Sequence, residues 1–122
     1  MRIAKTSHGT IGWIIKRSDY LHVQAGQRWA TAYFSIHIRP QAEPREHDWR
    51  VGFTTSRKVG SAVVRNRARR RLRELVRRHL PTAMKPGYDV VFVGRTAAAS
   101  APFDKLMQAL ADATKKMKVS HG

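Results

Sequence analysis

The chain has 122 residues, of which 42% are hydrophobic, and its 24 Lys and Arg against 8 Asp and Glu give a formal net charge of +16. This length suits one domain, and the apolar content excludes a disordered basic tail. So large an excess of cations predicts a polyanionic partner. Nucleic acid is favoured over an anionic membrane, because the apolar positions are needed for a core.

Cysteine is absent, which excludes disulfides, thiolate metal ligands and cysteine nucleophiles. The longest early apolar run, residues 11–15, is interrupted by Gly12 and is far shorter than the roughly 20 residues that cross a bilayer. Neither a signal peptide nor a membrane span is therefore expected, and the sequence predicts a cytoplasmic protein without membrane contact.

The first half of the chain predicts a short helix and two strands. Residues 1–10 lack periodicity, and residues 1–12 are expected to form a flexible arm. Ser18-Asp19 is a plausible N-cap for a helix over about 18–25, with Gly26 as a left-handed C-terminal cap. Alternating side chains then predict strands over 32–38 and 51–56, expected to run antiparallel in one sheet.

The second half predicts two longer helices around a third strand. An apolar stripe at helical spacing predicts a helix over 61–79 that ends before Pro81. The β-branched run at 88–93 is typical of a strand in the middle of a sheet. A last apolar stripe, over 103–117, predicts a helix capped by Ser100.

These elements predict a single small α+β domain over 13–118, followed by a tail at 119–122. Its order is helix, strand, strand, helix, strand, helix, with the helices packed on one face of the sheet. The other face would carry side chains too polar for a core, namely Tyr33, Ser35, His37, Thr54 and Ser56. We therefore expect water or a ligand against that face.

The predicted helix before Pro81 is the most basic part of the chain. Residues 57–78 contain ten cations and one acid, Glu74, and so supply +9 of the +16. The side opposite Ala68 would carry Asn66, Arg70, Arg73 and Arg77, flanked by Arg67 and Arg69. Arginine forks match phosphate oxygens, and a face used only for solubility would interleave both signs of charge. The pattern predicts a nucleic-acid surface.

The string R-K-V-G-S-A-V-V-R-N-R-A-R-R-R-L-R-E at 57–74, centred on Arg65-Asn66-Arg67, resembles the signature of the protein subunit of bacterial ribonuclease P. The resemblance covers roughly 13–118. It includes Lys16-Arg17-Ser18-Asp19-Tyr20, Arg50-Val51-Gly52-Phe53 and Gly87-Tyr88-Asp89-Val90-Val91.

The resemblance implies a helix-flanked sheet with a left-handed strand-helix-strand crossover, similar to a domain of one small-subunit ribosomal protein. It also implies a partner, the ribonuclease P RNA, which itself cleaves precursor tRNA with bound Mg²⁺. This chain would then contribute no catalytic residue and bind no metal or cofactor alone.

The resemblance further implies two sets of RNA-binding residues. The catalytic RNA would contact Arg57, Lys58, Arg65, Asn66, Arg67, Arg69, Arg70 and Arg73. The single-stranded 5′ leader of precursor tRNA would lie in a cleft between the first helix and the open sheet face, lined by Tyr20, Ser35, His37, Thr54 and Ser56. Gln24 and His37 stand where the family often has aromatic residues, so weaker base stacking is expected.

Three other hypotheses stay open on the residues alone. A structural or ribosomal-type RNA-binding protein would explain the charge but would have no effect on tRNA cleavage. A DNA-binding regulator would need varied side chains on its recognition helix, so duplex DNA is not expected. A stand-alone nuclease is disfavoured, because the histidines lack metal-ligand spacing and only Glu43, Glu46 and Asp48 cluster.

Overall fold

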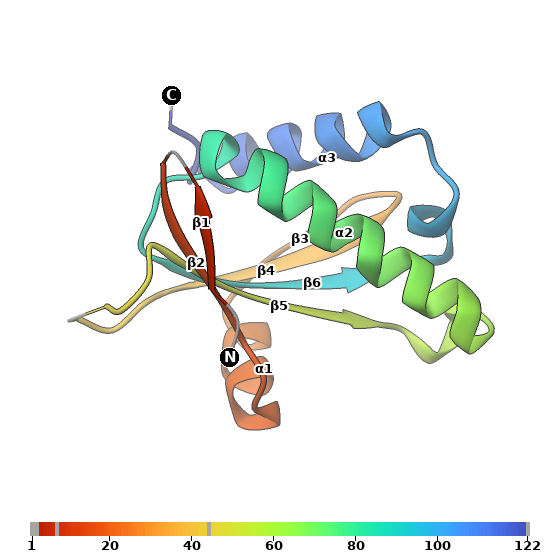
Figure 1. The fold of residues 1–122 in the computed structure, drawn as a ribbon, viewed down its shortest axis with the longest axis horizontal. Coiled ribbons are helices and arrows are strands. Elements are labelled where there is room, and N and C mark those ends of the chain that lie inside the picture. Colours follow the sequence, from red (N-terminus) through yellow and green to blue (C-terminus); the bar gives the residue numbers. More distant parts are fainter. Residues whose placement is uncertain (1–2, 7, 44, 122) are drawn as a thin grey trace.

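The frame of the protein is a sheet with strand order β1-β2-β5-β6-β4-β3 (Figure 1). We describe it from a computed structural model, which covers residues 3–6, 8–43 and 45–121, without the side chains of residues 3, 4 and 57. The strands are β1 (Ile3–Thr6), β2 (Gly9–Trp13), β3 (Gln27–Ala30), β4 (Phe34–Pro40), β5 (Trp49–Thr55) and β6 (Tyr88–Gly94). The helices are α1 (Arg17–Gln24), α2 (Ala62–Ala83) and α3 (Phe103–Lys116), and 3-10 turns η1 (Arg57–Val59) and η2 (Thr96–Ala99) precede α2 and α3.

The α+β class is confirmed, and the expected order is found with three further strands, β1, β2 and β3. Strand β3 was missed because all of its residues are exposed, so no apolar alternation marks it. The first two strands occupy residues that were expected to form a flexible arm. Within the described residues, no helix is long and apolar enough to span a membrane.

Strand β6 lies in the interior of the sheet, as its apolar run predicts. It pairs in parallel with β5 and antiparallel with β4. Val90, Val91 and Phe92 are fully buried, because both faces of the sheet are covered there. Strands β4 and β5 share one sheet and run antiparallel, as expected, with β6 between them.

The connection from β5 through α2 to β6 is left-handed. In Figure 1 both strands point to the right, β6 lies above β5, and α2 passes in front of them. Connections of this type are right-handed in nearly all proteins. The crossover that the resemblance implied is therefore present.

Helix α2 begins at a side-chain cap and ends later than its sequence predicts. The Val64 N–H donates to the Ser61 hydroxyl at 3.3 Å. The helix continues past Pro81 to Ala83, so the predicted end before Pro81 is wrong. Pro81 is buried in the last turns, where its ring packs in the interior and only one backbone hydrogen bond is lost.

The apolar stripe of α2 forms the main core together with α3 and one face of the sheet. Its buried members are Ala68, Leu72, Leu75, Val76 and Leu80, all of them inaccessible to solvent. Helix α3 contributes Leu106 and Leu110 to the same cluster. The two longer helices thus share a face, as expected, although Pro102 rather than Ser100 occupies the N-cap of α3 and makes no side-chain cap bond.

Helix α1 differs from the expected arrangement, because it packs on the opposite face of the sheet. Val23 forms a separate buried cluster there with Ile14 and Val91. Lys16 is the N-cap residue, and no side chain caps the helix. Gly26 is not in the left-handed conformation; a Cβ on it would lie 2.3 Å from the Ile38 carbonyl oxygen, so close backbone approach requires glycine.

The expected flexible arm is replaced by a hairpin of β1 and β2. Strand β2 pairs in parallel with the first half of β5, with Ile11 opposite Trp49 and Trp13 opposite Val51. Ile11 is completely buried in the main core. The hairpin therefore extends the sheet, and the edge of β5 is free only beyond Val51.

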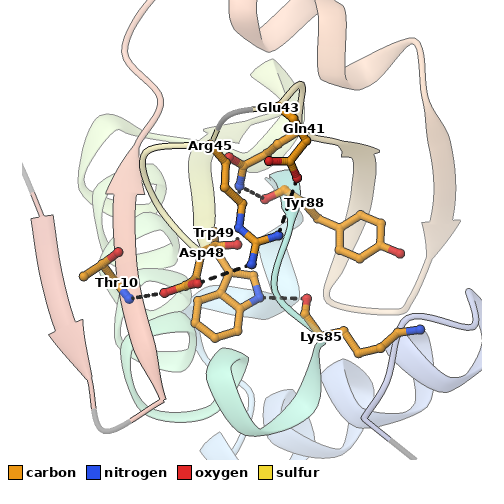
Figure 2. Close-up of polar contacts among 8 residues, drawn as sticks. All are labelled: Thr10, Gln41, Glu43, Arg45, Asp48, Trp49, Lys85 and Tyr88. Atoms are coloured by element: carbon orange, nitrogen blue, oxygen red, sulfur yellow. Dashed lines mark hydrogen bonds and ion pairs between the residues drawn. The ribbon is translucent and has the colours of Figure 1, made fainter.

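Asp48 joins this hairpin to the rest of the molecule (Figure 2). Its carboxylate accepts a hydrogen bond from the Thr10 N–H at 2.9 Å and lies 3.7 Å from the Arg45 guanidinium. Its carbonyl accepts from the Gly87 N–H at 2.6 Å. Gly9, at φ 144°, lies directly against the carboxylate, and a Cβ there would be 2.2 Å from Asp48 Oδ2.

Two polar residues of β4, Ser35 and His37, are buried on the face that α1 shares. The Ser35 hydroxyl and His37 Nε2 are 3.4 Å apart, and His37 is only 7% exposed. Burial lowers the pKa of His37 below its usual value of about 6.5, and the nearby Arg28 guanidinium lowers it further. The folded protein therefore holds this imidazole in its neutral form more strongly than the unfolded chain does.

This difference predicts a pH-dependent stability. As the pH falls from 7 through 6.5 to 5, the unfolded chain binds a proton at His37 more readily than the folded protein, so the free energy of unfolding should fall. Urea unfolding at each pH measures it. The fall should be shallower in His37→Gln, which cannot titrate; parallel curves for the two proteins would contradict the burial argument.

Candidate nucleic-acid interface

The outward face of α2 carries the predicted row of polar and basic side chains. The exposed members are Asn66, Arg67, Arg70, Arg73 and Arg77, while Arg65 and Arg69 are half-buried. Glu74 forms ion pairs with Arg77 at 3.6 Å and Arg78 at 2.8 Å, towards the C-terminal end of the helix. Within the described residues no ion pair forms at Arg65, Arg67, Arg70 or Arg73. The uncompensated charge therefore lies on the N-terminal two thirds of α2.

One arginine of the basic stretch points away from this surface. Arg71 donates hydrogen bonds to the carbonyl oxygens of Ala98, at 2.8 Å, and Ala101. It thereby fastens α2 to the segment that leads into α3. Its role is structural, although composition alone does not distinguish it from its neighbours.

The N-terminal approach to α2 adds further donors. Lys58 is exposed in η1, where its backbone N–H donates to the Ser56 hydroxyl at 3.1 Å. Gly60, at φ 114°, makes the turn between η1 and α2. The side chain of Arg57, predicted to contact RNA, lies outside the described residues.

On the opposite face, the ring of Tyr20 of α1 packs against Gly52 of the sheet. A Cβ on Gly52 would lie 2.7 Å from the Tyr20 ring, so glycine is required under it. The Tyr20 hydroxyl is 3.2 Å from both the N–H and the carbonyl oxygen of Phe53, and it accepts from the first and donates to the second. It thus satisfies backbone groups on the free edge of β5.

A groove of ≈ 400 Å³ runs between α1 and the free edge of β5. Two of the side chains along it are strongly exposed although apolar, Ile15 at 74% and Leu21 at 53%. The other residues that line it are Arg17, Tyr20, Gln24, Phe53 and Thr54. The groove therefore combines aromatic and aliphatic surface with one cation, which suits unstacked bases on a charged backbone.

A second hollow, of ≈ 360 Å³, lies beside it on this face, where Val93 pairs with Thr54. Ser35 and Ser56 line it together with Lys58 and two further cations, Arg28 and Arg95. The five predicted cleft residues therefore share one face of the sheet but do not line a single hollow. Tyr20 and Thr54 line the groove at α1, Ser35 and Ser56 line the second hollow, and His37 is buried.

Sequence reasoning missed several residues of this face and misplaced one. Gly52 and the exposed apolar pair Ile15 and Leu21 carried no periodic signal for a binding groove. Tyr33, expected on the open face, packs instead against the main core on the side of α2 and α3.

An ion-pair chain holds α1 in place over the sheet. Arg50 of β5 lies 3.5 Å from Asp19 of α1 and 3.2 Å from Asp89 of β6. Burial raises the pKa of Asp89 above its usual value, and the Arg50 guanidinium opposes that rise. The position of Tyr20, next to Asp19, thus depends on charges that are partly withdrawn from water.

The described residues contain no group of three or more His, Asp or Glu side chains that could hold a metal ion. The acidic cluster considered in the sequence is used otherwise: Arg45 lies between Glu43 at 3.9 Å and Asp48 at 3.7 Å (Figure 2).

Known proteins resemble the chain over most of its length. The family model described as Ribonuclease P matches residues 13–118. The ribonuclease P protein component of Ruegeria pomeroyi is 44% identical over 103 residues, which cover 84% of this chain and 82% of that protein. That of Clostridioides difficile is 34% identical over 106 residues, which cover 86% of this chain and 90% of that protein.

Solved structures show the same fold. The RNase P protein of Staphylococcus aureus superposes with a TM-score of 0.71 at 24% identity, covering 89% of this chain and 97% of that chain. The RNase P protein of Thermotoga maritima gives 0.69 at 25% identity, covering 84% and 94%. Together with the family match and the relatives above 30% identity, this shows that the chain belongs to the ribonuclease P protein family, the protein components of a tRNA-processing ribonucleoprotein endoribonuclease.

Proposed function

We propose that this chain is a cytoplasmic subunit that binds the ribonuclease P RNA through α2 and the 5′ leader of precursor tRNA through the groove at α1. The observation that carries the proposal is the row of exposed arginines on α2 without acidic partners, at Arg67, Arg70 and Arg73. In water these like charges repel one another. The phosphates of an RNA backbone would relieve that repulsion, and this favours binding. The RNA would hold the catalytic Mg²⁺ ions.

Several features of α2 favour a folded RNA over a generic counter-ion. Exposed arginines on one helical face present planar forks in a fixed register, and each fork can donate two parallel hydrogen bonds to a phosphate. Asn66 among them offers both a donor and an acceptor for a base edge or a 2′-hydroxyl. The residues proposed to contact the catalytic RNA are Arg57, Lys58, Arg65, Asn66, Arg67, Arg69, Arg70 and Arg73.

The opposite face supports a separate site for a single strand. The Tyr20 ring and the exposed Ile15 and Leu21 side chains provide stacking surface along the groove, while Arg17 offers a charge for the backbone. A leader crossing the face from Thr54 towards Ser35 and Ser56 would then reach the second hollow. His37 would support this surface from beneath, as its burial leaves little area for contact.

The direct test is cleavage of a precursor tRNA at low Mg²⁺ by a bacterial ribonuclease P RNA, with and without the protein and with the protein alone. The combination should cut efficiently at the mature 5′ end, because the cations of the protein replace Mg²⁺ in neutralising phosphates, and the protein alone should not cut. If the protein leaves cleavage by the RNA unchanged, a structural RNA-binding role replaces this proposal.

Charge removal on α2 should weaken RNA binding in a salt-dependent way. Arg70→Ala should lower affinity for the ribonuclease P RNA and reduce the slope of log K against log salt by about 0.7–0.9 for the lost phosphate contact. Filter binding across a salt series measures both quantities. Lys116→Ala, an exposed cation on α3, is the matched control and should leave the slope unchanged; equal effects of the two variants would contradict the proposed surface.

Loss of the Tyr20 ring should weaken binding mainly of substrates that have a leader. Tyr20→Ala should weaken binding of a leader-bearing precursor to the holoenzyme by roughly 1–3 kcal/mol of stacking, and binding of a leaderless tRNA much less. Tyr20→Phe keeps the ring and loses only the hydroxyl bonded to Phe53, so it separates stacking from strand-edge stability. Equal losses for both substrates in Tyr20→Ala would remove Tyr20 from the leader site.

A further inference from the structure

The arginines of α2 differ in how firmly they are held. The Arg73 guanidinium carbon lies over the Phe53 ring, 5.4 Å from its centroid. Arg69 donates to the Thr55 hydroxyl at 3.4 Å and to the Asn66 side-chain oxygen. No such contact is found for Arg67 or Arg70 within the described part of the chain. Two arginines are thus fixed against the sheet while their neighbours extend into solvent.

Both contacts come from the end of β5. Phe53 and Thr55 are two residues apart on this strand, so their side chains point to the same face, the one that α2 covers. This part of β5 is the free edge beyond the pairing with β2, which lets α2 side chains reach it from the side. One short strand end therefore supplies a ring for Arg73 and a hydroxyl for Arg69.

The Phe53 ring is itself held by two neighbours. It stacks on Phe92 of β6 with centroids 5.9 Å apart and an interplanar angle of 22°, and it meets the Trp13 ring of β2 at 5.8 Å. Only 9% of Phe53 is exposed. Trp13 is the last residue of the N-terminal hairpin, so the hairpin sets one side of the ring on which Arg73 rests.

We propose that Phe53 and Thr55, with Trp13 behind Phe53, are positioning residues that preorganise Arg73 and Arg69 for phosphates of the catalytic RNA. The inference rests on the proposed function, in which α2 docks that RNA. An arginine already restrained in the free protein loses less side-chain entropy on binding than a solvent-exposed one. Its cation–π contact also fixes the plane of the guanidinium, which a bidentate phosphate contact requires.

A double-mutant cycle on RNA affinity tests the proposal. In the wild-type background, Phe53→Leu should weaken binding of the protein to ribonuclease P RNA roughly three- to tenfold, the range expected for the cost of ordering one long side chain on binding. In an Arg73→Ala background the same change should have no further effect. Thr55→Val should likewise weaken binding in the wild-type background but not in an Arg69→Ala background. The losses of affinity caused by Phe53→Leu and by Arg70→Ala should be additive, because no contact joins the Arg70 side chain to Phe53 or Thr55 within the described residues.

Equal effects of Phe53→Leu with and without Arg73 would overturn the proposal, since a change acting only through the fold does not depend on residue 73. If Phe53→Leu reduces folding, Trp13→Leu takes its place in the cycle, with Trp13→Phe as its control. Trp13→Leu should weaken RNA binding when Arg73 is present but not in the Arg73→Ala background. Trp13→Phe, which keeps a ring, should not weaken binding. If Arg73→Ala and Arg70→Ala themselves leave affinity unchanged, it is the proposed function that fails.

Discussion

The packing of α2 on the sheet is the constraint on which both faces of this protein depend. Each large apolar side chain of its stripe, such as Leu72 or Leu75, contributes about 1.5–3 kcal/mol when fully buried, whereas like-charged neighbours on a helix surface cost about 0.2–0.5 kcal/mol a pair. Burial of the apolar stripe therefore outweighs the repulsion between the arginines, and it places them in one row on the outward side of α2. The repulsion raises the free energy of the unbound protein, so a polyanion that removes it binds more favourably.

Strand β5 connects the two proposed RNA surfaces. Its alternation sends Phe53 and Thr55 towards the arginines of α2, and Gly52 and Thr54 towards Tyr20 and the groove at α1. Arg50 of the same strand holds α1 through Asp19 and reaches Asp89 of β6. Because one strand serves both sides, the spacing between the catalytic RNA and the leader would be set by the thickness of the sheet rather than by a flexible linker.

Much of this arrangement was predictable from the sequence, and the failures have physical causes. The stripe of α2, the interior place of β6 and the outward arginines follow from periodicity, which reports burial directly. The hairpin of β1 and β2 was missed because Asp48 and the parallel pairing with β5, both distant in the chain, stabilise it. The end of α2 was predicted wrongly because the local sequence does not show that Pro81 is buried within the helix. The contacts of Arg71 and Arg73 could not be predicted, because they depend on residues that only the tertiary fold brings near.

The most direct test of the central claim is to map RNA from single positions on the protein surface. The chain has no cysteine, so one cysteine with a tethered iron chelate generates hydroxyl radicals at a unique place. Val63 on α2, Leu21 on α1 and Met107 on α3 are exposed and uncharged, at 72%, 53% and 37%, so each can be replaced without altering a cation. The account predicts cuts in the ribonuclease P RNA from Val63→Cys, cuts in the precursor leader from Leu21→Cys, and few from Met107→Cys. Strong cleavage from Met107→Cys with none from Val63→Cys would contradict it.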